Sequence, residues 1–112
     1  MSEKNISYLQ KVCHQVALEK GFYEGYCVPY NPSGFNNRPL PESIALMHSE
    51  LSEVLEAIRH TDEDKNNVGE EFADTVIRIM DTCEYLGINL EEEIFKKITI
   101  NKTREYKHGK KF

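Results

Sequence analysis

Apolar residues that recur every three or four positions are the feature that most restricts the fold of this chain. Such spacing places side chains on one face of a helix. It occurs in four stretches, at about residues 2–20, 41–59, 68–86 and 90–106, and no segment alternates apolar and polar residues long enough to demand a strand. A chain of 112 residues with 39% apolar residues suits one domain with one modest core. We therefore predict that residues 1–112 form a single all-α domain, a four-helix bundle.

Residues 21–38 interrupt the helical pattern. They contain three glycines, two prolines and five of the chain's eleven aromatic residues. A loop of this length in a compact domain is typical of a lid or a binding segment. Aromatic side chains also serve to pack a loop against the domain, so the sequence leaves both interpretations open.

Basic residues gather at the C-terminal end. Residues 95–112 hold seven of the 14 Lys and Arg residues but one of the 19 Asp and Glu residues, within a net charge of −5 for the whole chain. An acidic body with a basic tail argues against a protein that coats nucleic acid. Lys97, Asn101 and Arg104 would share one helical face, and His108 would join them if the helix continued.

The sequence lacks the patterns that are typical of membrane-spanning, secreted, disulfide-linked and zinc-binding proteins. No apolar run approaches the roughly 20 residues that a membrane-spanning helix needs. The first residues do not have the pattern of a secretory signal. Three widely spaced cysteines without a CxxC pair support neither a disulfide framework nor a zinc site. We expect a cytoplasmic protein with reduced cysteines and no membrane partner.

Two pairs of carboxylates lie about one helical turn apart on consecutive predicted helices. Glu50 and Glu53 form an ExxE pattern, and Glu71 and Asp74 form an ExxD pattern. On a helical wheel both pairs border the apolar stripe of their helix. A short polar linker at 61–66 joins the two helices, which should therefore pack antiparallel and bring the pairs together.

Four carboxylates in one place need a compensating cation. Two carboxylates 5–6 Å apart repel each other by about 3 kcal/mol at an effective dielectric of 20. Oxygen ligands without paired His or Cys favour Mg²⁺, with Mn²⁺ as a substitute. Because Mg²⁺ shares its coordination with substrate phosphates, the pattern predicts phosphate chemistry. Acidic pairs also occur on solvated helix surfaces, which is the simpler interpretation of either pair taken alone.

Together the motifs resemble those of the MazG-like nucleotide pyrophosphohydrolases. Residues 46–59 are similar to the first acidic motif of that family, and residues 70–78 are similar to the second. The ending at 106–110, Tyr-Lys-His-Gly-Lys, resembles the tail of the small single-domain members. The resemblance runs from about Pro41 to the C-terminus, and it is the combination of motifs that carries it.

The resemblance implies an all-α nucleoside triphosphate pyrophosphatase that cleaves (d)NTP to (d)NMP and pyrophosphate, in house-cleaning or nucleotide-pool control. It implies a homodimer or a dimer of dimers, which agrees with the wide apolar surface expected on helix 68–86. The metal ligands that it assigns are Glu50, Glu53, Glu71 and Asp74. The substrate contacts that it assigns are Lys97, Asn101, Arg104, Tyr106, His108 and Lys110.

Ser49 departs from the family pattern, because many members have a second acidic residue at this position. A serine there cannot act as the base, so the expected mechanism is centred on the metal, which activates the attacking water. Lys97 and Arg104 would offset charge that develops on the phosphates. Phe22, Tyr23 and residues 36–38 are candidates for stacking on and hydrogen-bonding a nucleobase, without a preference for one base.

Two other classes remain as alternatives. A non-catalytic helical interaction module would present the acidic face to a basic partner. A di-iron carboxylate bundle would need a Glu-x-x-His pattern on each of two helices. The chain has one such pattern, at Glu105 and His108 in the tail, which argues against a di-iron site.

Overall fold

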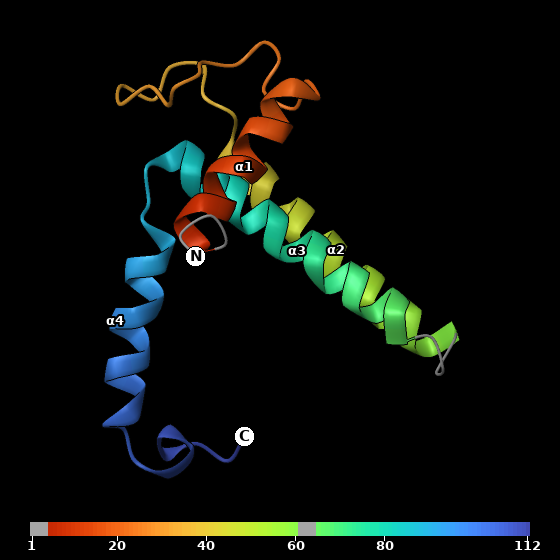
Figure 1. The fold of residues 1–112 in the computed structure, drawn as a ribbon, viewed down its shortest axis with the longest axis vertical. Helices are drawn as coiled ribbons and strands as arrows, with labels where there is room; N and C mark the ends of the chain where they lie inside the picture. Colours follow the sequence, from red (N-terminus) through yellow and green to blue (C-terminus); the bar gives the residue numbers. More distant parts are fainter. Residues whose placement is uncertain (1–4, 61–64) are drawn as a thin grey trace.

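The computed structural model describes residues 5–60 and 65–112, and within these ranges the chain is all-helical, with no strand. The four helices are α1 (Ile6–Glu19), α2 (Leu40–His60), α3 (Lys65–Leu86) and α4 (Leu90–Lys102), and a short 3-10 helix (Tyr106–Gly109) follows them (Figure 1). The predicted fold class and helix number are confirmed. The expected first turn at residues 2–4 and the linker residues 61–64 lie outside the described ranges.

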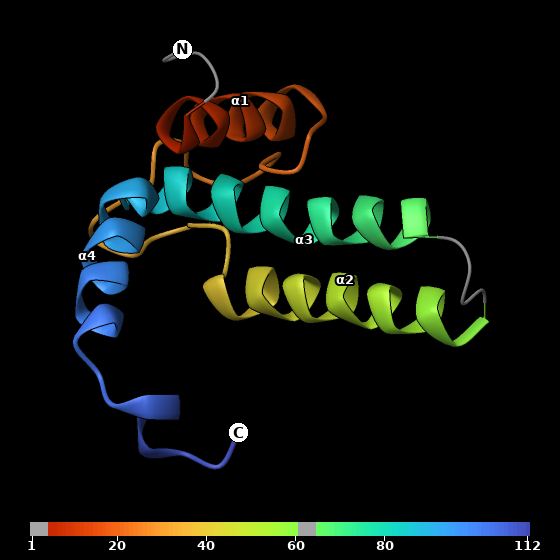
Figure 2. The ribbon, with the colours of Figure 1, turned by 60° about the horizontal axis from the view of Figure 1, so that its bottom comes forward.

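Helix α3 is the central element, because α1 packs on one side of it and α2 on the other (Figure 2). The contact between the antiparallel helices α2 and α3 buries Val54 and Ala57 of α2 and Thr75 of α3. All three side chains are small or medium-sized, which allows the two helices to approach closely over their length. This packing places the two predicted acidic motifs on neighbouring helices, as expected.

The loop between α1 and α2 is held on the domain by buried tyrosines. Tyr23 and Tyr85 are 5% and 6% exposed, and their ring centroids lie 4.6 Å apart. The Tyr85 hydroxyl donates to the Cys27 carbonyl over 2.6 Å. Tyr30 adds an edge contact to Tyr85, with 5.7 Å between the ring centroids. At least part of the aromatic content of the loop therefore packs it down, which is one of the two interpretations that the sequence left open.

Helix α4 begins at a side-chain cap and leaves the other helices (Figure 1). The Asn89 side chain accepts a hydrogen bond from the Glu92 amide over 3.1 Å, as the predicted capping box requires. One further contact ties the start of α4 to α1, where the Ser7 amide donates to Glu91 over 3.1 Å. Beyond this first turn α4 extends away from α2 and α3, and the C-terminal tail lies apart from both in the two views (Figure 2).

The fourth helix is shorter than predicted, because it ends at Lys102 and not at 106. The amides of Thr103 and Arg104 bond to carbonyls three residues back, which tightens the last turn and closes the helix. In the following 3-10 segment Lys107 and His108 have φ angles of 56° and 55°, which an α-helix does not accommodate. His108 therefore does not continue the helical face of Lys97 and Asn101.

Several apolar side chains are exposed in a single chain. On α2 and α3 they include Leu51, Leu55, Ile58, Phe72 and Val76, and on α4 they are Phe95, Ile98 and Ile100. Across the described parts of the chain, every helix is too short or too polar to span a membrane, and the cysteine thiols are free.

Candidate functional site

Three of the four predicted metal ligands meet where α2 faces α3. Glu50, Glu71 and Asp74 each offer a carboxylate oxygen, and these oxygens all lie within 4.8 Å of one another. Glu53, one turn after Glu50, is more exposed and stands outside this group, but its charge still acts on Glu71. The antiparallel packing of α2 on α3 thus joins the ExxE and ExxD motifs, as the sequence predicted.

The electrostatics of the cluster are those of crowded negative charge. The pKa of the Glu71 carboxyl is raised, first by loss of hydration and then by the charges of Asp74, Glu53 and Glu50, with Glu70 adding to them. A group of like charges holds a proton more tightly because ionisation of each member is opposed by the others. A divalent cation would relieve the same repulsion.

The donor set fits a hard divalent cation. Ligands of an octahedral Mg²⁺ ion lie about 2.9–4.2 Å from one another, given metal–oxygen distances of roughly 2.1 Å. Oxygens within 4.8 Å reach that spacing through small side-chain rotations. All three ligands are carboxylates, and the group contains neither a thiol nor an imidazole, so the chemistry favours Mg²⁺ or Mn²⁺ over Zn²⁺.

Arg78 lies at the edge of the cluster and pairs with one of its members. Its Nε donates to the Glu50 carboxylate over 3.0 Å. This is the one hydrogen bond of Arg78 to other residues in the described ranges, so its terminal guanidinium nitrogens are free to meet another anion. Because Glu50 accepts at one oxygen, the bond also orients this carboxylate relative to Glu71 and Asp74.

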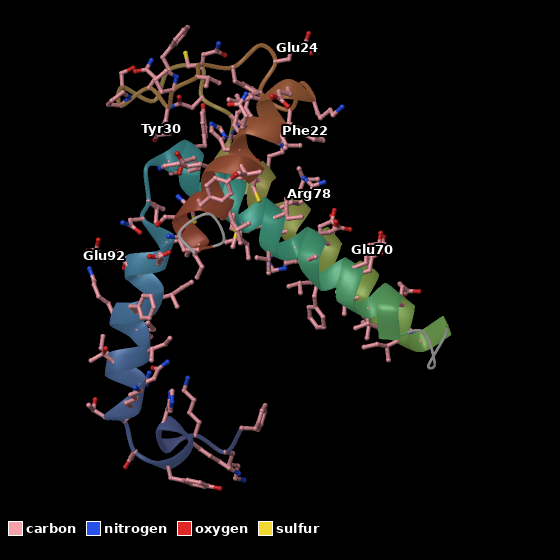
Figure 3. All side chains as sticks on the ribbon, viewed as in Figure 1. Phe22, Glu24, Tyr30, Glu70, Arg78 and Glu92 are labelled. Atoms are coloured by element: carbon pink, nitrogen blue, oxygen red, sulfur yellow. The ribbon has the colours of Figure 1, made fainter. Side chains whose placement is uncertain are left out.

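A cavity of about 450 Å³ opens beside the carboxylates. This volume lies within the range typical of small-molecule sites. Glu50, Asp74 and Arg78 line one end of it. Figure 3 shows Phe22 and Arg78 on the same side of the molecule, where α1 and α3 meet. The remaining walls are mostly apolar and come from α1, α3 and the loop, with Val12, Cys13, Val16, Ala17, Phe22, Arg38, Ile77 and Asp81 as members.

Asp81 marks the far end of this cavity, two helical turns from Asp74 and about 10 Å along the axis of α3. The residue is 9% exposed. Its Oδ1 atom lies 2.8 Å from His14 Nδ1 and accepts a 2.9 Å hydrogen bond from the Tyr23 hydroxyl. Both contacts use one oxygen, and within residues 5–60 and 65–112 Oδ2 has no hydrogen-bond partner. The cavity therefore has an acceptor at the end opposite the carboxylate cluster.

Burial and the charge of Asp81 raise the pKa values of two neighbouring side chains. The pKa of the Tyr23 hydroxyl is raised, first by burial and then by the Asp81 charge. The pKa of the Cys13 thiol is raised by the same two causes in the same order. Both groups therefore stay protonated at neutral pH, and Cys13 behaves as a wall of the cavity and not as a nucleophile.

Arg38 adds a cation to the cavity from the loop. Its guanidinium lies 5.3 Å from the ring centroid of Tyr23 and 6.0 Å from that of Phe22, and Nη1 donates to the Phe22 carbonyl over 3.2 Å. Its Nε atom is buried without a hydrogen-bond partner among the described residues. A buried donor of this kind is costly unless something accepts from it.

The residues predicted to contact a nucleobase differ in their position relative to the cavity. Phe22 and Arg38 line the cavity. Tyr23 is buried behind it, against Asp81. The amide groups of Asn36 and Asn37 are used inside the loop, where they donate to the Gly25 and Asn31 carbonyls.

The predicted substrate contacts of the C-terminal region do not join the carboxylates within one chain. Figure 3 shows Glu70 and Arg78 on the side of α3 that faces away from α4 and the tail. Lys97 and Asn101 lie on α4, and Arg104 lies beyond its end. Tyr106, His108 and Lys110 fall in or after the 3-10 helix, and all six residues are exposed.

Arg78 and Asp81 line the cavity and His14 contacts Asp81, although the sequence motifs assign none of the three a role. Arg78 and Asp81 continue the helical face of Asp74 at i+4 and i+7, which is a signal that the sequence contains. His14 belongs to the apolar stretch of α1 and reaches Asp81 only through the packing of α1 on α3. No local pattern could have identified that contact.

Comparison of the chain with protein-family models, curated proteins and solved structures returned no match. The resemblance to the MazG-like family therefore stays a prediction. A proposal for the function rests on the carboxylate cluster and the cavity beside it.

Proposed function

We propose that this protein is a Mg²⁺-dependent nucleoside triphosphate pyrophosphohydrolase of the MazG-like type, which cleaves a (d)NTP to the (d)NMP and pyrophosphate. The observation that carries the proposal is the position of the Glu50, Glu71 and Asp74 cluster at one end of a cavity of about 450 Å³. A carboxylate cluster that can hold a cation, beside a mostly apolar cavity, suits a ligand with a polyphosphate at one end and a base at the other.

The carboxylates would act by holding the cation. Glu50, Glu71 and Asp74 would ligate it, and Glu53 would add charge from one turn away. When bound, Mg²⁺ supplies positive charge to the phosphates and acidifies the water that attacks phosphorus. Ser49 cannot serve as the base, and its hydroxyl already donates to the Leu46 carbonyl over 2.7 Å.

Arg78 would act on the phosphates directly. Its Nε is fixed by Glu50, and the terminal nitrogens remain for a phosphate oxygen. A planar guanidinium suits this role because it donates two parallel hydrogen bonds to an oxyanion. It would offset charge on the phosphates as the bond to the leaving pyrophosphate breaks.

The rest of the cavity would take the nucleoside. Phe22 and the aliphatic walls exclude water and offer a stacking surface. The free Oδ2 of Asp81 can accept from an amino or imino group of the base, and the Arg38 guanidinium adds a positive charge to the cavity wall. Every common base has an amino or imino group, so the proposal covers (d)NTPs as a class.

A panel of nucleoside triphosphates with Mg²⁺, assayed for monophosphate and pyrophosphate, tests the proposal. We expect turnover of at least one triphosphate, loss of turnover with EDTA, and loss in Asp74→Asn and Glu53→Gln with the helical fold retained by circular dichroism. Glu93→Gln is the matched control, because this exposed carboxylate lies on α4 and, among residues 5–60 and 65–112, forms an ion pair with Lys96 alone, over 3.6 Å.

Two results would oppose the proposal. Release of orthophosphate and diphosphate would refute pyrophosphatase chemistry. No turnover of any triphosphate, together with no binding of Mn²⁺, would favour the non-catalytic interaction module.

A further inference from the structure

We propose that Asp81 selects the base of the substrate, and that it favours bases with an exocyclic amino group (cytosine, adenine and guanine) over uracil and thymine. The inference rests on the proposed function and narrows it from triphosphates as a class to those with an amino-bearing base. It gives Asp81 a specificity-determining role that is separate from the cation site at Glu50, Glu71 and Asp74.

The fixed position of the Asp81 carboxylate is the first argument. Its Oδ1 atom lies 2.8 Å from His14 Nδ1 and accepts a 2.9 Å hydrogen bond from the Tyr23 hydroxyl. His14 belongs to α1 and Tyr23 to the loop that follows it, so two segments outside α3 hold this side chain. A carboxylate held in this way distinguishes one base from another, because it cannot rotate to suit both.

The second oxygen of the same carboxylate is the part that a base can reach. Oδ2 has no hydrogen-bond partner in the part of the chain that the structure describes. Two other unpartnered polar atoms there, Gln10 Oε1 and Arg38 Nε, are sealed from solvent, and Oδ2 is not one of them. Because a carboxylate oxygen accepts hydrogen bonds and does not donate them, this end of the cavity offers a negatively charged acceptor.

The common bases differ in how they meet such an acceptor. Uracil and thymine have one N–H on the pairing edge, between two carbonyl oxygens that the carboxylate would repel. Cytosine, adenine and guanine carry an amino group whose neighbouring ring atoms are nitrogen or carbon, so that it can donate to Oδ2 without bringing a carbonyl beside the charge. A hydrogen bond to a charged group corresponds to a factor of about 10 to 100 in binding.

The arginines that line the cavity do not cancel this preference. Arg38 donates from Nη1 to the Phe22 carbonyl, and its Nε is sealed. Any further hydrogen bond from its guanidinium to the O2 carbonyl of a pyrimidine would serve cytosine and uracil equally. Arg78 is bound through Nε to Glu50, at the cation end. A comparison of dCTP with dUTP therefore isolates the edge of the base that would face Asp81.

The test compares kcat/KM for dCTP and dUTP with Mg²⁺ in the wild type, in Asp81→Asn and in Tyr23→Phe. The wild type should favour dCTP by about tenfold or more. Asp81→Asn should reduce this preference to less than about threefold, because an amide can donate to the uracil carbonyl as well as accept. Tyr23→Phe is the matched control, since it removes a hydroxyl from Oδ1 and leaves Oδ2 unchanged, so the preference should persist.

A merely structural role of Asp81 would predict a different pattern, in which Asp81→Asn lowers kcat/KM for both triphosphates alike and leaves their ratio unchanged. Oδ2 would then face the adjoining cavity of about 10 Å³ that Asp81 also lines, which has room for about one water molecule. That result, or a wild type that hydrolyses dUTP as well as dCTP, would overturn the inference and leave the proposed function standing.

A substrate analogue gives the same answer without a variant, which matters if Asp81→Asn does not fold. The deoxyribonucleoside triphosphate of 2-pyrimidinone has hydrogen in place of the amino group of cytosine. The wild type should hydrolyse it with a kcat/KM about tenfold below that for dCTP. Equal values for the two would overturn the inference.

A wild type that hydrolyses no triphosphate would instead refute the proposed function. Binding of deoxycytidine and deoxyuridine, measured by saturation-transfer NMR without metal, then decides whether Asp81 selects the base. Stronger binding of deoxycytidine that is lost in Asp81→Asn would support the selection, and equal binding or no binding of the two nucleosides would overturn it.

Discussion

Replacing Tyr23 with phenylalanine removes one hydroxyl from the contact that holds the loop on α3. The ring remains, so its packing at 4.6 Å from Tyr85 is kept. What is lost is a 2.9 Å hydrogen bond to Asp81, between residues that are 5% and 9% exposed. Tyr23→Phe therefore isolates the contribution of one buried, charge-assisted hydrogen bond to stability.

The expected loss of stability depends on the acceptor of this hydrogen bond, the Asp81 carboxylate. Hydrogen bonds to charged groups contribute about 1.5–3 kcal/mol. Asp81 Oδ1 keeps its contact with His14 at 2.8 Å, so the carboxylate is not left without a partner. We therefore expect the lower part of this range, a decrease of about 2 kcal/mol in the free energy of unfolding.

Urea denaturation followed by circular dichroism measures this change as a lower midpoint with an unchanged slope. Tyr30→Phe is the control, because Tyr30 lies in the same loop and touches Tyr85, and its hydroxyl has no hydrogen bond among the described residues. The control should change stability by less than about 0.5 kcal/mol. A Tyr23→Phe protein as stable as the control would refute the anchoring role of the Tyr23–Asp81 bond.

Three further changes have defined outcomes. In EDTA, Glu71→Gln should raise the melting temperature at neutral pH. The pKa of Glu71 in the folded protein is raised above 4.5, so the stability of the wild type falls as the pH rises from 4.5 through that raised value. The difference in melting temperature between variant and wild type should therefore shrink when the pH is lowered. Asp81→Asn should raise KM for the triphosphate more than it lowers kcat, because Asp81 lies at the base end of the cavity; equal KM values would contradict that placement. Asn89→Ala should destabilise the protein by about 1 kcal/mol in urea titrations, since it removes the cap on the Glu92 amide.

The fold class and the carboxylate cluster could be predicted because both depend on local spacing. The three- and four-residue recurrence of apolar residues determines helices, and an ExxE or ExxD pattern fixes two carboxylates on one face whatever surrounds them. Their meeting required one more step, the antiparallel packing that a short linker imposes on two helices. Glu50, Glu71 and Asp74 come together for these reasons.

The rest of the site depends on packing between distant segments. The contact of His14 with Asp81 joins residues 67 positions apart, and the placement of Phe22 and Arg38 depends on how the loop folds back. The sequence predicts an end of the fourth helix at about residue 106, because residues 103–106 continue a helical pattern. In the structure the helix closes earlier, since the amides of Thr103 and Arg104 bond to carbonyls three residues back. That early end is also why the basic residues of the tail do not share one helical face.

The products of a triphosphate incubated with Mg²⁺, identified by ³¹P NMR for the wild type and for Asp74→Asn, test the proposed function most directly. We expect signals of a monophosphate and pyrophosphate with the wild type and an unchanged triphosphate with Asp74→Asn. Signals of diphosphate and orthophosphate, or equal turnover by the two proteins, would contradict it.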